Sequence, residues 1–127
     1  VQARVLDHYQ RIVGAHAPAP SLLLVQAPIF HGHAFSIYVE LGQVADVEEV
    51  SRALAGEHVN LTHGADDAPT NVNAAGQNDI QVSIAPDANQ PNGLWLWAAS
   101  DNLRVAAATA VECAETMAAT RPRGKIQ

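Results

Sequence analysis

The sequence is short of cysteine, of basic residues and of long apolar runs, and each shortage excludes a class of protein. Its single cysteine cannot form an internal disulfide, so we expect no disulfide scaffold and a reducing, cytoplasmic setting. Seven Lys and Arg stand against 13 Asp and Glu, and a formal charge of -6 argues against a nucleic-acid or anionic-membrane partner. The longest apolar run, residues 22–30, is interrupted by Gln26 and Pro28 and is far shorter than the ~20 residues of a membrane-spanning helix.

Two further signals are missing. No basic segment followed by an apolar core opens the sequence, so we expect no secretory signal peptide. Neither G-x-G-x-x-G nor G-K-[ST] is present, so we expect this chain to bind no nucleotide cofactor by itself. The sequence begins at Val1 rather than at Met, and we interpret residues 1–127 as one domain excised from a longer chain.

What is present suits one packed domain. The 127 residues include 48% apolar and 16% charged side chains, which is enough for a core. Three segments have the apolar spacing of amphipathic helices. They are residues 1–13, which end at Gly14, residues 46–55, with Asp46 as N-cap and Glu49 three positions later, and residues 102–119, capped by Asp101 or Ser100.

Five shorter segments have strand character. Residues 34–41, 79–85 and 94–99 alternate between apolar and polar side chains, residues 57–62 form a shorter candidate, and residues 21–27 are an apolar run bracketed by prolines. Residues 63–78 read as a polar loop and residues 86–93 as a turn. The order predicts an α+β fold, with a mainly antiparallel or mixed sheet and helices packed on one face.

Three groups of side chains could carry chemistry or binding. His31 and His33 have a usable metal-ligand spacing, with His58, His63 and Glu40 as the available further donors; the alternative is one packing and one surface histidine. Cys113 lies mid-helix between Glu112 and Glu115, where a thiolate is disfavoured, so we interpret it as a packing residue. Trp95 and Trp97 share one strand face and either lie under a helix or form an apolar patch for a partner.

Two segments resemble a known family. Residues 26–41 (QAPIFHGHAFSIYVEL) resemble the R-V-P-V-x-x-G-H-S stretch of aspartate-semialdehyde dehydrogenases and the x-V-x-V-E strand that follows it. Residues 93–104 (GLWLWAASDNLR) resemble that family's G-L-x-L-W-x-x-x-D-N-L-R segment. The resemblance covers nearly the whole chain and corresponds to the C-terminal, dimerising part of such an enzyme. It implies a fold like the C-terminal domain of glyceraldehyde-3-phosphate dehydrogenase-like enzymes.

The resemblance also assigns roles residue by residue. The histidine of G-H-S, the family's acid/base residue, matches His33, and the serine after it is replaced by Ala34. The arginine that binds the substrate carboxylate matches Gln26, which cannot supply a charge-assisted bidentate pair. The family's G-R-I-R stretch should fall within residues 79–87, which contain no arginine. Asn102 matches an asparagine near the nicotinamide, or else serves to cap the last helix.

Three hypotheses follow. In the first, the chain is the dimerisation and part-catalytic domain of an NADP-dependent semialdehyde dehydrogenase-like oxidoreductase, inactive alone because the nucleophilic cysteine and the NADP-binding domain lie upstream. Its partners are then a second copy and that N-terminal domain. In the second, the same fold is a catalytically degenerate association module. In the third, it is a small metal-binding α+β protein that uses His31 and His33.

Overall fold

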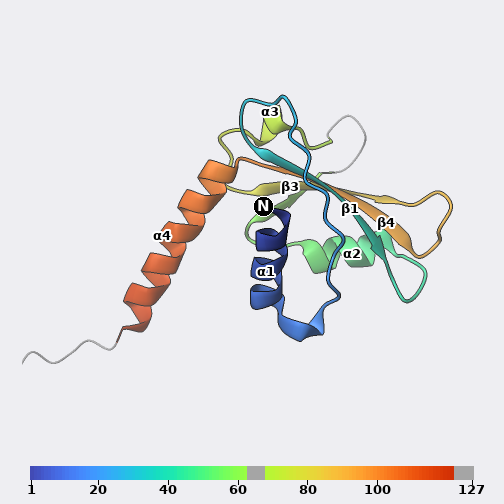
Figure 1. Ribbon diagram of the computed structural model, residues 1–127, viewed down its shortest axis with the longest axis horizontal. Helices are drawn as coiled ribbons and strands as arrows, with labels where there is room; N and C mark the ends of the chain where they lie inside the picture. The colour runs from blue at the N-terminus through green and yellow to red at the C-terminus, as the bar shows by residue number, and fades with distance from the viewer. Residues whose placement is uncertain (63–67, 122–127) are drawn as a thin grey trace, which may run out of the picture.

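A computed structural model describes residues 1–62 and 68–121, and it places a four-stranded sheet at the centre of the fold (Figure 1). The elements follow one another as α1 (Gln2–Val13), a short 3-10 turn (Gly14–His16), β1 (His33–Glu40), α2 (Val47–Leu54), β2 (Val59–Leu61), α3 (Asn71–Ala74), β3 (Ile80–Pro86), β4 (Gly93–Ser100) and α4 (Asn102–Thr120). The predicted helices and four of the five predicted strands are confirmed within a residue or two.

The sheet has the order β1-β4-β3-β2 and is mixed. β4 pairs antiparallel with β1 and with β3, whereas β2 pairs parallel with β3. Residues directly opposite one another share a face, so Phe35, Ala98 and Val82 lie side by side on one surface of the sheet. The predicted α+β class with a mixed sheet is therefore confirmed.

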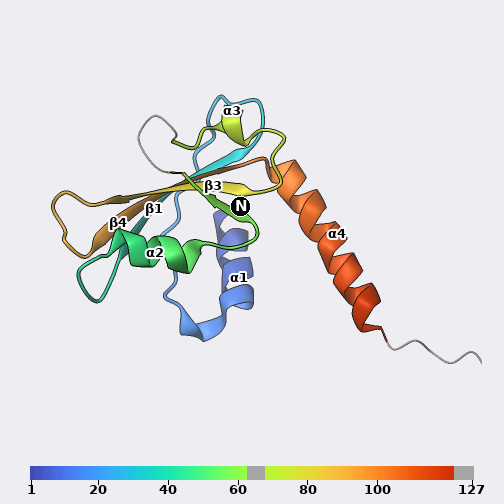
Figure 2. The ribbon, with the colours of Figure 1, turned by 180° about the vertical axis from the view of Figure 1, so that it is seen from behind.

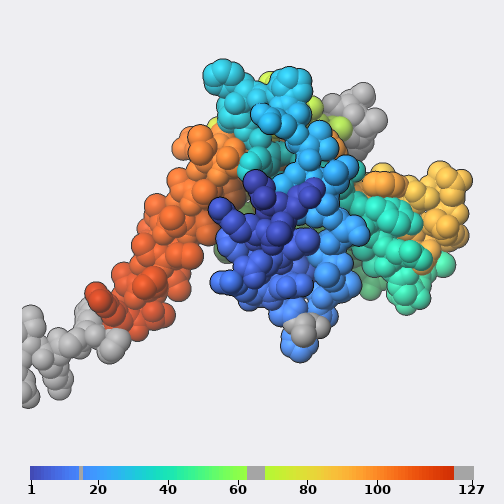
Figure 3. Space-filling view, viewed as in Figure 1, coloured from blue at the N-terminus to red at the C-terminus, as the bar shows by residue number. Residues whose placement is uncertain are grey.

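The buried apolar residues gather on the two central strands and on α3. They are Ala74, Val82, Leu94, Ala98 and Ala99. α2 packs against β3, and in both views α1 and α2 lie on one side of the sheet while α3 lies on the other (Figures 1 and 2). α4 extends away from the sheet, and the space-filling view shows it standing clear of the main body (Figure 3).

The predicted strand at residues 21–27 is wrong, because residues 17–32 form neither helix nor strand. A strand requires a neighbour for its backbone hydrogen bonds, and β1 at this edge of the sheet pairs with β4 alone. The two prolines that flank the segment, Pro20 and Pro28, also lack an N–H donor. The Leu22 carbonyl accepts a hydrogen bond from Gln2 Nε2 at 3.3 Å, but one side-chain donor does not replace the regular backbone pairing of a strand.

The predicted polar loop at residues 63–78 is wrong over Asn71–Ala74, which form α3, while residues 63–67 lie outside the described residues. A capping box begins this helix. Thr70 Oγ1 accepts from Asn73 N at 3.1 Å, and Asn73 Oδ1 accepts from Thr70 N at 2.7 Å. Cys113, predicted to pack, is exposed on α4.

Trp95 and Trp97 lie half-exposed on the face opposite Phe35, at 44% and 40%. Their indole N–H groups donate to Asp87 Oδ2 at 2.8 Å and to the Pro69 carbonyl at 2.7 Å, so both rings are held in place. Of the two arrangements that the sequence left open, the structure therefore shows an apolar patch on the sheet.

Candidate functional site

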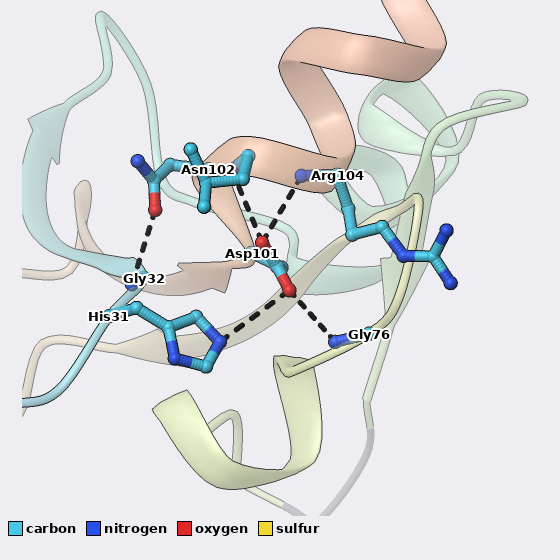
Figure 4. Close-up of polar contacts among 7 residues, drawn as sticks. His31, Gly32, Gly76, Asp101, Asn102 and Arg104 are labelled. Atoms are coloured by element: carbon cyan, nitrogen blue, oxygen red, sulfur yellow. Dashed lines mark hydrogen bonds and ion pairs between the residues drawn. The ribbon is translucent and has the colours of Figure 1, made fainter.

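The two segments that carry the family resemblance meet where β1 begins and β4 ends. His33, the first residue of β1, lies opposite Ser100, the last residue of β4. The chain reaches His33 through a turn at His31 and Gly32, and it leaves Ser100 directly into α4. Residues about 70 positions apart therefore form one cluster (Figure 4).

Asp101 is the centre of this cluster. It is the N-cap of α4, and its Oδ1 accepts from Leu103 N at 3.2 Å and Arg104 N at 3.1 Å, which satisfies two free donors of the first helical turn. Its Oδ2 accepts from Gly76 N at 2.9 Å, across 25 residues of sequence. The side chain is buried. The Gly76 N–H first, then the Arg104 and Leu103 N–H groups and the neighbouring His31, lower the pKa of Asp101 although burial opposes this.

His31 faces this carboxylate. Its Nε2 lies 3.6 Å from Asp101 Oδ2, and its side chain is 43% exposed against 8% for Asp101. The imidazole also meets Phe30 edge-on, with ring centroids 6.2 Å apart. His31 is therefore oriented from one side by a fixed negative charge and open to solvent on the other.

Gly32 has a backbone conformation that glycine favours, with φ at +96°. Its N–H donates to Asn102 Oδ1 at 3.1 Å. A Cβ at this position would lie 3.0 Å from the Ser100 carbonyl oxygen and 3.1 Å from Asn71 Nδ2. The turn therefore packs directly against the end of β4, and no larger residue fits without movement.

His33 is exposed at the start of β1, and its ring stands edge-on to Phe35 with centroids 6.1 Å apart. Gln26 is exposed within residues 17–32, ahead of the turn. Asn102, at the first position of α4, contacts Gly32 through its side chain and leaves the capping of the helix to Asp101. The structure thus brings Asn102 to the turn that precedes His33, whereas among the described residues no hydrogen bond or ion pair joins Gln26 to the cluster.

Sequence reasoning missed three participants, namely Asp101 as the partner of His31, Gly76, and Asn71. Asn71 Nδ2 is buried beside Gly32 and lacks a hydrogen-bond partner within the described residues. Asp101 was predicted only as a helix cap, and the D-N pair before an amphipathic helix indicated no more than that. The other contacts join segments far apart in sequence, and nothing local predicts them.

The metal hypothesis gains no support from this geometry. His31 is directed to Asp101, and the described part of the chain holds no group of three or more His, Cys, Asp or Glu side chains arranged to bind a metal ion. His63, one of the donors considered, lies outside the described residues. Over residues 1–62 and 68–121, no helix has the length and apolarity needed to cross a membrane.

Comparison with solved structures defines the class of protein. The fold matches the crystal structure of aspartate semialdehyde dehydrogenase II from Vibrio cholerae complexed with ASA, with a TM-score of 0.65 and 33% identity. The match covers 75% of this chain and 29% of that chain. The fold is therefore that of an α+β domain of an aspartate-semialdehyde dehydrogenase.

Sequence comparison gives the family. Aspartate-semialdehyde dehydrogenase 2 of Vibrio cholerae is 36% identical over 77% of this chain and 31% of its own length. The aspartate-semialdehyde dehydrogenase of Mycolicibacterium smegmatis is 36% identical over 91% of this chain and 34% of its own length. The chain thus spans about a third of these curated relatives. The family model "Semialdehyde dehydrogenase, dimerisation domain" matches residues 2–105, and the chain belongs to this family.

Proposed function

We propose that the chain is the dimerisation and part-catalytic domain of an NADP-dependent oxidoreductase that interconverts an aldehyde and an acyl phosphate in amino-acid biosynthesis. The observation that carries this proposal is the contact between the two family-like segments: Gly32 N–H donates to Asn102 Oδ1 at 3.1 Å. That contact presents His33 at the end of a rigid turn, exposed and next to the start of α4.

His33 is the proposed acid/base residue. An imidazole suits that role because its pKa in water lies near neutral pH, so it can both take and return a proton. His33 follows a glycine that is held on two sides, and its ring is exposed. We place the nucleophilic cysteine upstream of residue 1, because Cys113 lies on α4 between acidic neighbours and not beside the turn.

The NADP-binding domain is proposed to lie upstream as well, in the two thirds of the relatives' length that this chain does not cover. NADP would accept or supply the hydride of the reaction. Asn102 is the proposed contact to its nicotinamide from this domain. Because Asn102 Oδ1 accepts from Gly32, the Nδ2 donors are the atoms that such a contact would use. The single cysteine supports a cytoplasmic location.

A second copy of the chain is the proposed partner, and Trp95, Trp97 and Tyr38 provide the surface. These side chains are 44%, 40% and 41% exposed on one face of the sheet. Aromatic residues on an apolar face are typical of homodimer interfaces. In sedimentation velocity, Trp97→Ser should shift the full-length protein from dimer toward monomer, whereas Val111→Ser on exposed α4 should not.

The test of activity uses the full-length parent chain and follows NADPH formation with aspartate semialdehyde and phosphate. We expect turnover that His33→Gln lowers by about 10²–10⁴-fold, the usual contribution of an acid/base residue. The 127-residue chain alone should show none. Turnover by this chain alone would place the nucleophile within residues 1–127 and contradict the proposal.

A second candidate function is a non-catalytic association module, and the lack of charge on the side chain of Gln26 favours it. Gln26 stands where the resemblance requires an arginine, and β3 (Ile80–Pro86) contains no arginine either. A charge-assisted bond to a carboxylate contributes ~1.5–3 kcal/mol, and the side chain of Gln26 cannot supply it. A folded, NADP-binding parent without turnover would support this candidate. Recovery of turnover in Gln26→Arg would instead indicate a changed substrate.

A further inference from the structure

Two contacts from the start of α4 reach the turn before His33: Asp101 contacts His31, and Asn102 contacts Gly32. His31 Nε2 lies 3.6 Å from Asp101 Oδ2, and Gly32 N–H donates to Asn102 Oδ1 at 3.1 Å. Figure 4 shows both contacts reaching from the start of α4 to the same stretch of chain. Two neighbouring contacts restrain a short segment more than one contact does.

The anchors themselves cannot shift freely. Asp101 accepts hydrogen bonds from Leu103, Arg104 and Gly76, so its carboxylate is held by both the first turn of α4 and the loop after α3. Asn102 is the first residue of α4, and its backbone direction is set by that helix. The contacts to residues 31 and 32 therefore end on rigid groups.

The position of His33 follows from these contacts. Its backbone is fixed on one side by Gly32 and on the other by the pairing of β1 with β4, in which His33 lies opposite Ser100. Asn71 Nδ2, from α3, also lies close to Gly32. The imidazole of His33 is thus carried by a backbone whose preceding residue is held by Asn102 and which is itself paired with β4.

We propose that Asn102 and the Asp101–His31 pair are positioning residues that set the direction of the His33 imidazole. This inference rests on the proposed role of His33 in the full-length enzyme. A misplacement of about 1 Å at a reacting group can lower a rate by about 10²-fold, so loss of either contact should lower kcat rather than substrate binding.

The decisive experiment is steady-state kinetics of the full-length parent with Asn102→Leu and His31→Asn and, as a matched control, Asn60→Leu at an exposed position of β2. The leucine removes the acceptor for Gly32 N–H, and the asparagine removes the imidazole that faces Asp101. We expect Asn102→Leu to lower kcat by about tenfold or more with KM for the aldehyde within about twofold. Asn60→Leu should stay within about threefold of wild type.

Several results would overturn the inference. An unchanged kcat in Asn102→Leu would do so, as would a change confined to KM for NADP, which would leave Asn102 as a cofactor contact alone. If Asn102→Leu fails to fold, His31→Asn decides the question, because His31 is part-exposed, its imidazole contacts Asp101 and Phe30, and it has no proposed role toward the cofactor. We expect a fall in kcat of about threefold to tenfold there, and an unchanged kcat counts against the inference.

The same series separates this inference from the proposed function. His33→Gln with wild-type turnover would show that His33 is not the acid/base residue, and the proposed function would then fail. An inactive His33→Gln together with a fully active Asn102→Leu and His31→Asn would leave the proposed function intact and reject only the positioning role.

Discussion

The two ends of β4 are each fixed by an aspartate that accepts three N–H donors. At one end Asp87 accepts from Asn89 N, Gln90 N and the Trp95 indole at 2.8–2.9 Å. At the other end Asp101 accepts from Gly76 N, Leu103 N and Arg104 N at 2.9–3.2 Å. These hydrogen bonds lower the pKa of both carboxyls, so both are ionised in the folded protein at neutral pH.

The difference lies in how far along the chain the partners are. All three donors to Asp87 lie within eight residues of it, so the carboxylate closes a single β-hairpin. Asp101 binds a donor 25 residues away and faces His31 at 70 residues' separation, so it joins three segments. A local aspartate stabilises one turn, whereas a long-range aspartate can hold a functional group in place.

Gly32→Ala tests the Asp101 end and should have the largest effect. The change forces a side chain into φ +96° and brings a Cβ to 3.0 Å from the Ser100 carbonyl, which is backbone and cannot easily move. The strained backbone alone should lower the free energy of unfolding by about 1–3 kcal/mol, and the close contact should add to this loss. Urea denaturation measures the effect.

Gly42→Ala is the matched control for that experiment. Nothing lies within 4 Å of a Cβ at Gly42, and its φ is not in the left-handed region. Its free energy of unfolding should stay within about 1 kcal/mol of wild type or rise slightly, because alanine restricts the unfolded chain. Equal losses in the two variants would show that the turn at Gly32 is no tighter than an open loop.

Gly93→Ala tests the Asp87 end and should rank second. Its Cβ would lie 2.6 Å from Tyr38 Oη and 3.1 Å from Asp87 Cβ, within the hairpin that Asp87 closes. Overpacking of this kind lowers the free energy of unfolding by about 1–3 kcal/mol. Because the nearest obstacle is a hydroxyl group, Tyr38→Phe in the same chain should recover part of the loss.

The double variant therefore separates the two ends of β4. Partial recovery in Gly93→Ala/Tyr38→Phe would mean that the crowding lies at the end of one side chain. At Gly32 the obstacle is backbone, and no single side-chain change should rescue it. A double variant no more stable than Gly93→Ala alone would contradict the assignment of the clash to the Tyr38 hydroxyl.

The fold was largely predictable because its signals are local. The alternation in residues 34–41, 79–85 and 94–99 identified β1, β3 and β4, and Asp46 was found as a cap that accepts from Glu48 N and Glu49 N. The two failures have different causes. The run at residues 21–27 has strand composition but pairs with no strand among the described residues, which its own sequence cannot reveal. The capping box of α3 was missed for a local reason, because it uses an asparagine where the common pattern has Glu or Gln.

The site was predictable only through resemblance. The family resemblance over residues 26–41 and 93–104 identified His33 and Asn102 as candidates. No local pattern indicates that Asn102 binds Gly32 or that Asp101 faces His31. Such contacts depend on the β1–β4 register, which places His33 opposite Ser100. The roles of His33, Gln26 and Asn102 in the reaction stay predictions until the full-length protein is assayed.

Acid titration compares the two aspartates directly, through Asp101→Asn and Asp87→Asn. A carboxyl whose pKa in the folded state lies below its ordinary value of 3.8 contributes stability above that pH, and the contribution disappears as the pH falls through the folded pKa. Wild type should therefore lose stability as the pH falls below the ordinary carboxyl pKa of 3.8 toward the lower folded values, and each variant should lose less. Urea midpoints at a series of pH values measure this slope.

At neutral pH the two asparagine variants should differ. Asp101 is buried, and its replacement leaves Gly76 N and His31 facing an amide nitrogen that cannot accept a hydrogen bond. Asp87→Asn leaves the half-exposed Trp95 indole able to reach water. Asp101→Asn should therefore be the more destabilised variant, and the reverse order would mean that burial does not distinguish the two ends of β4.

The smallest effect is expected at the middle of α4, where His58 bridges two acidic residues. His58 Nε2 lies 3.2 Å from Glu112 Oε2, and Nδ1 lies 3.8 Å from Asp79 Oδ1, with all three side chains between 45% and 51% exposed. Exposed contacts of this kind contribute about 0–1 kcal/mol even when both partners are charged, and a histidine is charged only when protonated, so His58→Gln should lower the free energy of unfolding by no more than this. Arg11→Gln, which removes the exposed Arg11–Asp7 pair of α1, is the matched control.

Measuring the effect of His58→Gln at several salt concentrations is a more specific test of this prediction. The loss in His58→Gln should shrink as the salt concentration rises, because ions screen exposed charges far more than buried ones. None of the residues of α4 is buried. We therefore expect the attachment of α4 to the sheet to depend on its first turn, where Asp101 and Asn102 contact the residues before His33. A large, salt-independent loss in His58→Gln would instead make the middle of α4 its main attachment, and the long-range aspartate would no longer be what fixes the helix.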